Sequence, residues 1–384
     1  MFEKINKEET IHNKHDIIAD MQLTLDREAF LKKLEIVSKV STKHLTLPVL
    51  QCVLLKAEDS TLQMSSTNLE LGIEANMKAS VTKGGDIAVP ASVLLQTVSL
   101  VSEKEITLKE EDGGLVVRSG NGESLIKSVP FEDFPSIPKV EGGGQKLNNK
   151  LFSLGIKSVA FAASQTSIKP ELGSVYVFQK KEHSLTFVAT DSFRLMEKTV
   201  PQKGVFFDSS VLIPQKNAIE ISRILDALDS DPLCRFNENQ FSLDFEEGVY
   251  VTSRLVAGSF PDYEQIMPKE FSTSAVLLRE DLTRSFRKTS IFLNKFSQVG
   301  LSVGDNSLKV SAVGGDAGTT TESVRAEIDG EGVVLNFNQR YLSEGLAHFV
   351  DDSVMLQLSG VGRPLVVKGV SDGTVRYLVM PMNK

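Results

Sequence analysis

The chain has few cysteines and no long uninterrupted apolar run, and these two absences exclude several classes of protein. Its two cysteines, Cys52 and Cys234, have neither the spacing of a metal site nor the number of a secreted disulfide scaffold. We therefore expect two small buried side chains in a protein of the reducing cytoplasm. The mostly apolar residues 87–101 include Pro90 and several polar residues, so no stretch reaches the roughly 18 apolar residues of a membrane span.

Sequence signals of metal or nucleotide chemistry are also missing. The histidines, His12, His15, His44, His183 and His348, show no helical zinc-site spacing. The glycine clusters at residues 120–122 and 142–144 lack the third glycine of a dinucleotide fingerprint, and no Gly-Lys-Ser/Thr phosphate loop occurs. We therefore predict turns at these glycines, no metal site and no cofactor.

One tripeptide keeps a hydrolase open as a rival interpretation. Thr190-Asp191-Ser192 follows an apolar strand pattern and could supply a nucleophile with an orienting acid, but no histidine adjoins it. The carboxylates at residues 110–112 and 246–247 sit beside glycine, as hairpin tips usually do. No general acid and base can be named, so the sequence favours a protein that is not an enzyme.

A long pattern occurs three times along the chain. Each copy opens with a strand and an amphipathic helix, at residues 23–40, 145–163 and 275–292. A second helix is announced after Pro90, Pro214 and Asn338, which are 124 residues apart in both intervals. A period of this length is the size of a whole domain. The sequence therefore predicts three tandem α+β domains, each with two helices packed on antiparallel sheets.

Strand patterns and corners complete each copy and set the expected boundaries. Alternating strands follow the first helices at residues 49–65, 173–190 and 298–312, and the copies close near Phe134-Pro135, Phe260-Pro261 and Met380-Pro381-Met382. Glycine-rich residues 141–146 and the Ser-Thr run 272–274 mark the junctions. We predict domains at residues 21–145, 146–271 and 272–384, preceded by a flexible extension, residues 1–20.

Charge is unevenly distributed over this repeat. The formal net charge of −8 argues against a protein that binds DNA over its whole surface. The first helix of each copy is nevertheless basic, and the third carries Arg279, Arg284, Arg287 and Lys288. Such a protein could present a positive inner surface and a negative outer one.

Four segments carry a family resemblance. They are Thr46-Leu-Pro-Val-Leu50, Val188-Ala-Thr-Asp-Ser-Phe-Arg-Leu195, Ser259-Phe-Pro-Asp-Tyr263 and Tyr377-Leu-Val-Met-Pro-Met382. In this order and spacing, the chain from Met21 onward resembles the bacterial DNA polymerase III beta subunits, the sliding clamps. The resemblance implies the DNA clamp fold and a head-to-tail homodimer whose six domains form a ring around duplex DNA. It implies a processivity factor without catalysis of its own.

The resemblance also implies sites. A pocket between the second and third domains would bind short peptides of the polymerase alpha subunit, the clamp loader and repair proteins. Its matching positions are Leu172, Thr190, Ser192, Phe193, Arg194, Leu195, Pro261, Ile266, Leu378, Met380, Pro381 and Met382, with Arg194 as a polar anchor. DNA-facing positions are His44, Lys169, Gln215 and Lys216, and the dimer interface would include Ile126, Ile291 and Phe292.

The chain departs from the family pattern at several of these positions. Ser192-Phe193 stands where many members have glycine and histidine, and Pro170-Glu171 follows Lys169 where an aromatic pair can stand. His44 and Gln215 stand where basic residues are common. DNA affinity is therefore expected to be weak or to depend on other lysines. A three-domain adhesion protein is the remaining rival, disfavoured by the cysteine usage and by the C-terminal segment.

Overall fold

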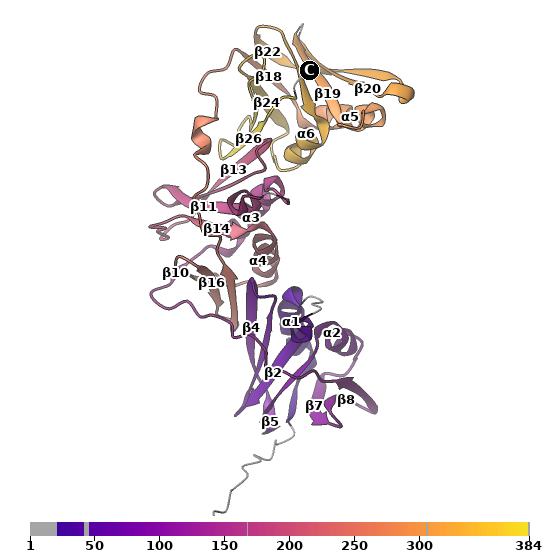
Figure 1. The fold of residues 1–384 in the computed structure, drawn as a ribbon, viewed down its shortest axis with the longest axis vertical. Helices are drawn as coiled ribbons and strands as arrows, with labels where there is room; N and C mark the ends of the chain where they lie inside the picture. Colours follow the sequence, from indigo (N-terminus) through magenta and orange to yellow (C-terminus); the bar gives the residue numbers. More distant parts are fainter. Residues whose placement is uncertain (1–20, 42–45, 167, 305, 383–384) are drawn as a thin grey trace, which may run out of the picture. The chain divides into compact units, whose positions relative to one another are not determined.

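The structure is a computed structural model that describes residues 21–41, 46–166, 168–304 and 306–382 (Figure 1). Residue contacts divide the chain into two compact units, one ending at Ile137 and the other beginning at Pro138. The predicted extension at residues 1–20 and the candidate His44 lie outside the described residues. None of the helices found in the described ranges is long and apolar enough to cross a membrane.

The first unit contains one copy of the repeated pattern. A five-stranded antiparallel sheet has the order β5 (Ser80–Lys83), β1 (Gln22–Asp26), β7 (Glu105–Glu111), β8 (Gly114–Ser119) and β9 (Gly122–Lys127). A second antiparallel run has the order β4 (Leu71–Lys78), β3 (Thr61–Thr67), β2 (Cys52–Glu58) and β6 (Gly85–Pro90). Helices α1 (Arg27–Val37) and α2 (Ala91–Ser99) pack against each other.

The second unit contains the other two copies, and one sheet runs through both. Its nine strands are, in order, β14 (Val211–Pro214), β11 (Ser174–Lys181), β12 (Ser184–Thr190), β13 (Arg194–Pro201), β26 (Val375–Val379), β25 (Leu365–Gly369), β24 (Ser353–Leu358), β18 (Thr273–Leu278) and β22 (Glu327–Gly330). The second and third copies meet where β13 pairs with β26. This junction places the middle of the sequence beside its end.

Two smaller strand groups and four helices complete this unit. One group has the order β10 (Gln145–Lys146), β15 (Leu233–Phe236), β16 (Gln240–Phe245) and β17 (Val249–Arg254). The other has the order β21 (Thr319–Arg325), β20 (Ser307–Val313), β19 (Gln298–Gly304) and β23 (Val333–Asn338). The helices pack in pairs, α3 (Asn149–Val159) with α4 (Gln215–Ala227) and α5 (Arg279–Thr289) with α6 (Gln339–Leu346) (Figure 1).

The predicted repeat is confirmed element by element. Strand and first helix open each copy as β1–α1, β10–α3 and β18–α5, and a 3-10 turn ends each first helix, at Ser38–Val40, Ala160–Ala162 and Ser290–Phe292. The second helices begin directly after Pro90, Pro214 and Asn338, as predicted. Proline fixes its own φ at a value that suits a helix start, while the Asn338 side chain accepts a hydrogen bond from Arg340 N.

Close packing of helices on strands requires glycine at α6. A Cβ on Gly345 would overlap the ring of Tyr377, a fully buried tyrosine of β26 whose hydroxyl donates to Tyr341 O at 2.8 Å. The absence of a side chain at Gly345 therefore lets α6 lie directly on the strand that ends the chain. Elsewhere, Cys52 and Cys234 are buried and unpaired, as predicted, and burial raises the pKa of Cys52 to about 11.

Candidate functional site

Several of the predicted pocket residues lie on the paired strands β13 and β26 and on the segments next to them. Leu195 lies opposite Leu378 and Arg194 opposite Val379 in the antiparallel register. Beyond β26, Met380 N donates to Phe193 O at 2.8 Å, and Met382 N donates to Asn336 O at 2.7 Å. The chain end is thus anchored along one side of the 190–195 segment. Segments almost 190 residues apart in the sequence therefore lie side by side.

The members of this group differ in how they meet solvent. Leu195, Leu378 and Leu172 are buried in the fold, so they can form only the floor of a pocket. Phe193 is 60% exposed and Ile266 is 51% exposed. Pro261 is also exposed, and the residues at the chain end, Met380, Pro381 and Met382, are half-buried. An apolar floor bordered by accessible apolar side chains can take up a hydrophobic peptide segment.

The turn between β12 and β13 explains the tripeptide that suggested a hydrolase. Thr190 Oγ1 donates to Arg194 O at 2.6 Å and accepts from Ser192 N at 3.1 Å. Asp191 Oδ1 accepts from both Phe193 N and Arg194 N at 3.0 Å. These side chains hold a tight turn, so Thr190 is no nucleophile activated by a base, and Asp191 orients backbone amides.

A second nucleophile-like motif has the same explanation. Residues 369–373 read Gly-Val-Ser-Asp-Gly, the spacing of a nucleophile elbow, which needs a strand followed by a helix. Here the segment joins strands β25 and β26. Ser371 Oγ donates to Asp351 Oδ1 at 2.7 Å, and Ser371 N donates to Asp351 Oδ2 at 2.8 Å. Ser371 is therefore part of a carboxylate-capped turn.

The Arg194 side chain is buried and bonds to other groups of the protein. Its guanidinium donates to Asp191 Oδ2 at 3.0 Å, to Phe161 O at 3.0 Å and to Glu344 Oε2. It also lies 4.6 Å from the centroid of the Tyr341 ring. Burial alone would lower the pKa of Arg194, but the bond to Glu344 and the nearby negative charges outweigh it and raise the pKa. Arg194 thus ties the 190–194 turn to α6, and the expected polar anchor is used internally.

The guanidinium of Arg194 lies over the ring of Phe161, which in turn stacks on His348. The ring of His348 lies 4.2 Å from that of Phe161 at an interplanar angle of 7°. Burial lowers the pKa of His348, although the charge of Glu344 opposes the shift. At physiological pH the imidazole of His348 is therefore neutral and packs against Phe161 as an aromatic ring.

Ser192 stores backbone strain in this turn. Its φ of +76° is in the left-handed region, which costs an L-residue about 1–2 kcal/mol. We predict that Ser192→Gly raises the melting temperature by about 2 °C, because glycine removes the strain while giving back part of the gain as unfolded-state entropy. Ser192→Ala, which keeps the Cβ, should show no gain in the same thermal melts. Equal melting temperatures for the two variants would mean that the turn is unstrained.

The predicted DNA-facing residues separate into different environments. Lys169 is exposed next to the 3-10 turn Pro170–Gly173, and Lys216 is exposed in the first turn of α4. Gln215 is buried, and its amide donates to Ala160 O at 2.7 Å, so that amide supports the fold. Several basic side chains of the helices have acidic neighbours, including Lys157 with Asp226 and Lys288 with Glu322 at 2.8 Å. The helices are therefore less positive than their lysines and arginines alone suggest.

The predicted interface residues also differ in exposure. Ile291 is 71% exposed and Phe292 is half-buried in the 3-10 turn after α5. Ile126, in contrast, is only 4% exposed because it points into its own domain. Successive side chains of a strand face opposite sides, so β9 presents Leu125, which is 50% exposed. The accessible apolar residue on β9 is thus the neighbour of the one expected.

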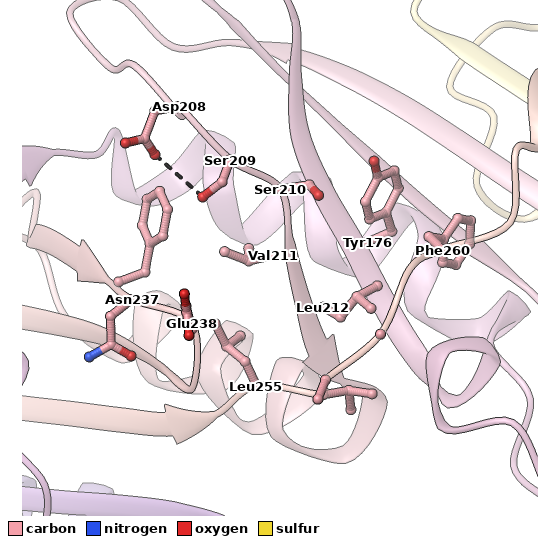
Figure 2. Close-up of a pocket in the computed structure, with 14 residues that line it drawn as sticks. Tyr176, Asp208, Ser209, Ser210, Val211, Leu212, Asn237, Glu238, Leu255 and Phe260 are labelled. Atoms are coloured by element: carbon pink, nitrogen blue, oxygen red, sulfur yellow. Dashed lines mark hydrogen bonds between the residues drawn. The ribbon is translucent and has the colours of Figure 1, made fainter.

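One further hollow, with a volume of about 440 Å³, is lined by residues of the second copy of the fold, between Tyr176 and Phe260 in the sequence. Figure 2 shows the rings of Tyr176 and Phe260 on one side and Asp208, Ser209 and Glu238 around the rim. The two rings are parallel, with centroids 4.7 Å apart. None of the predicted pocket residues lines it. Within the described part of the chain, no cluster of His, Cys, Asp or Glu could hold a metal ion.

Three domain models of one protein family match this chain, one after another along the sequence. Family models of the DNA polymerase III beta subunit match as the N-terminal domain at residues 21–138, the central domain at 146–262 and the C-terminal domain at 264–383. The beta sliding clamp of Pseudomonas putida is 29% identical, over 94% of this chain and 100% of its own. That of Synechococcus elongatus is 28% identical, over 94% and 99%.

Solved structures agree with the sequence comparisons. The DNA polymerase III beta subunit of Pseudomonas aeruginosa superimposes with a TM-score of 0.89 at 27% identity, covering 95% of this chain and all of that one. A sliding clamp of the same organism bound to griselimycin gives a TM-score of 0.87 at 27% identity, with the same coverage. The chain therefore belongs to the DNA polymerase III beta subunit family, the beta sliding clamps, which are non-catalytic processivity factors of that polymerase.

Proposed function

We propose that this sliding clamp works as a head-to-tail homodimeric ring around duplex DNA and tethers the replicative polymerase through the β13–β26 pocket. The observation that carries the proposal is the match of three clamp domains, in order, over residues 21–383. We propose domains at residues 21–145, 146–271 and 272–384. We propose that the clamp acts in the cytoplasm, on chromosomal DNA.

A ring resolves the conflict between an acidic chain and a DNA-bound function. A duplex threaded through a closed ring cannot leave sideways, so weak contacts to phosphates are sufficient and base contacts are unnecessary. Only the lining then needs positive charge, and the net charge of −8 can reside on the outer surface. The exposed Lys169 and Lys216 are candidates for that lining.

The ring itself can be tested with DNA of different topology. After loading by a clamp loader, the protein should stay on nicked circular DNA during gel filtration and be lost once the circle is cut open. Light scattering of the free protein should give a dimer. Equal retention on circular and linear DNA would contradict a topological link, and tight sequence-selective binding to linear duplex would do the same.

The contribution of the two lysines can be measured separately. We predict that Lys169→Gln with Lys216→Gln weakens binding to a short duplex, because both positions lose a contact to phosphate. Each lost contact should make the fall of log K with log salt shallower by about 0.9. Fluorescence anisotropy over a range of salt concentrations measures this slope. The control, Lys181→Gln with Lys203→Gln, removes the same charge from two other exposed positions. A slope that changes equally in both pairs would place the DNA contacts elsewhere.

For partner peptides we propose apolar recognition by Phe193, Pro261, Ile266, Met380 and Met382. These side chains are exposed or half-buried around a buried floor. Methionine and isoleucine adapt to different apolar anchors, which suits a surface shared by the polymerase alpha subunit, the clamp loader and repair proteins. Because Arg194 is engaged with Glu344 and Asp191, polar recognition would fall to backbone groups at the rim.

A further inference from the structure

We propose that Tyr263 is a positioning residue of the peptide pocket: by donating to the buried carboxylate of Glu197, it fixes the connector wall that carries Pro261 and Ile266. The connector is residues 260–267, which lead from the second copy of the fold to the third. The inference rests on the proposed peptide-binding function and identifies the residue that sets the shape of that site. Tyr263 itself is buried, so its action on a ligand is indirect.

The connector alternates between anchored and exposed residues. Phe260 stacks on Tyr176 at 4.7 Å, with the rings within 5° of parallel, and this stack is visible in Figure 2. Tyr263 is 5% exposed and Met267 is 8% exposed. Pro261 and Ile266 lie between these anchors and face solvent. The positions of the two exposed residues are therefore set by the buried ones.

The anchors enter the same apolar cluster that forms the pocket floor. Tyr263 and Met267 pack in one cluster with Leu195 and Leu378, and half-buried Met380 packs against it. Wall, floor and chain end thus share one packed core. Because such cores are close-packed, a displacement of Tyr263 is transmitted to the residues that a peptide would touch.

A buried ionic network holds the tyrosine hydroxyl. Tyr263 Oη donates to Glu197 Oε2 at 2.6 Å. The same carboxylate, 5% exposed, accepts from Arg376 Nε at 2.9 Å and from Arg376 Nη2 at 2.6 Å. Arg376 and Lys180 also contact Glu264 of the connector, so two carboxylates face two cations. A buried carboxylate with this many donors is well satisfied and fixes the direction of each of them.

Strand geometry connects the network to the pocket. Glu197 and Arg376 are directly opposite in the β13–β26 pairing, and Leu195 and Leu378 are opposite each other two residues away. Residues two apart on a strand face the same side, so the carboxylate and the floor lie on one face of the sheet. Burial raises the pKa of Tyr263, and the bond to Glu197 raises it further, so the phenol remains a donor at physiological pH.

The test compares two tyrosines that each tether a connecting segment. Tyr263→Phe removes only the hydroxyl that bonds Glu197. The matched control, Tyr250→Phe, removes a hydroxyl that donates to Pro138 O at 3.1 Å and accepts from Val140 N at 3.0 Å, outside the pocket. The probe is a fluorescent peptide from the clamp-binding segment of the polymerase alpha subunit, with full-length dimeric protein and anisotropy as the readout.

We expect Tyr263→Phe to weaken peptide binding by about three- to tenfold, the range for one lost charge-assisted hydrogen bond that acts partly on the site. Tyr250→Phe should change the affinity by less than about twofold, although both variants lose a buried hydrogen bond and some thermal stability. If the wild type binds the peptide and Tyr263→Phe binds it equally well, the positioning role of Tyr263 is wrong, while the proposed peptide-binding function still stands.

A second peptide separates positioning from general loosening. With a probe whose terminal apolar anchor is replaced by alanine, the difference between wild type and Tyr263→Phe should shrink, because the misplaced wall then has no anchor to contact. An equal loss with both peptides would assign Tyr263 to stability only and reject the positioning role. If wild type binds neither peptide, the proposed pocket function fails first, and the inference fails with it.

Discussion

We expect deletion of Met380–Lys384 to abolish binding of a polymerase-derived peptide and to leave the dimer intact. The deletion removes the half-buried side chains of Met380 and Met382, which border the apolar floor. It also removes the two backbone bonds, to Phe193 O and Asn336 O, that hold the chain end in place. The remaining wall residues, Phe193 and Ile266, would face an open side, so a peptide would lose most of its apolar contact.

The experiment needs a control for the loss of any chain end. Deleting only Asn383 and Lys384 keeps all the contacts described above and should leave peptide affinity within about twofold, far below a hot-spot effect. β26 ends at Val379 and stays paired with β13 and β25 in both variants, so both should fold and dimerise. Anisotropy gives the affinity and light scattering gives the mass. A dimer of the longer deletion that binds the peptide as wild type does would remove the chain end from the site.

The arrangement of elements could be predicted because its signals are local or periodic. Pro90, Pro214 and Asn338 mark helix starts through their own backbone and capping chemistry, and their equal spacing reveals the repeat. That Leu195 lies near Leu378 could be predicted only from the family resemblance. Nothing in the periodicity of two separate strands specifies which pairs with which across 183 residues.

The roles of individual polar side chains were harder to predict. Arg194 was predicted as a polar anchor for a ligand, and its bonds to Glu344 and Phe161, 150 and 33 residues away, were not foreseen because no local pattern indicates them. Gln215 was predicted to face DNA, but its side chain is buried and its amide donates a hydrogen bond to Ala160 O. Tyr263 was missed altogether, since its value as an anchor depends on the buried Glu197. β13 also carries Arg194, Lys198 and Thr199, so nothing in its own sequence marked Glu197 as the buried carboxylate.

The second large effect that we expect is loss of the dimer when the apolar residues after α5 are replaced by charged ones. Replacing Ile291 and Phe292 by aspartate should convert the dimer into monomers, because each carboxylate would be buried without a partner in an apolar interface. Such a charge costs about 3 kcal/mol or more, so the dimer should weaken by at least about a hundredfold. Light scattering at micromolar concentration measures the change. Ile291→Asp alone, at a position 71% exposed, should weaken the dimer without disturbing the protomer.

The opposite side of the interface gives an independent test. Leu125→Asp should also yield monomers, because β9 ends the order of its sheet and presents this 50% exposed side chain, whereas Ile126 is part of the domain core. Val361→Asp is the control, since Val361 is 83% exposed in a turn after β24 and outside the proposed contact. Monomers from Ile291 and Leu125 variants but not from the control would identify the two surfaces that meet. A double Ile291→Asp, Phe292→Asp variant that remains dimeric with a normal melting temperature would show that the ring closes through other residues.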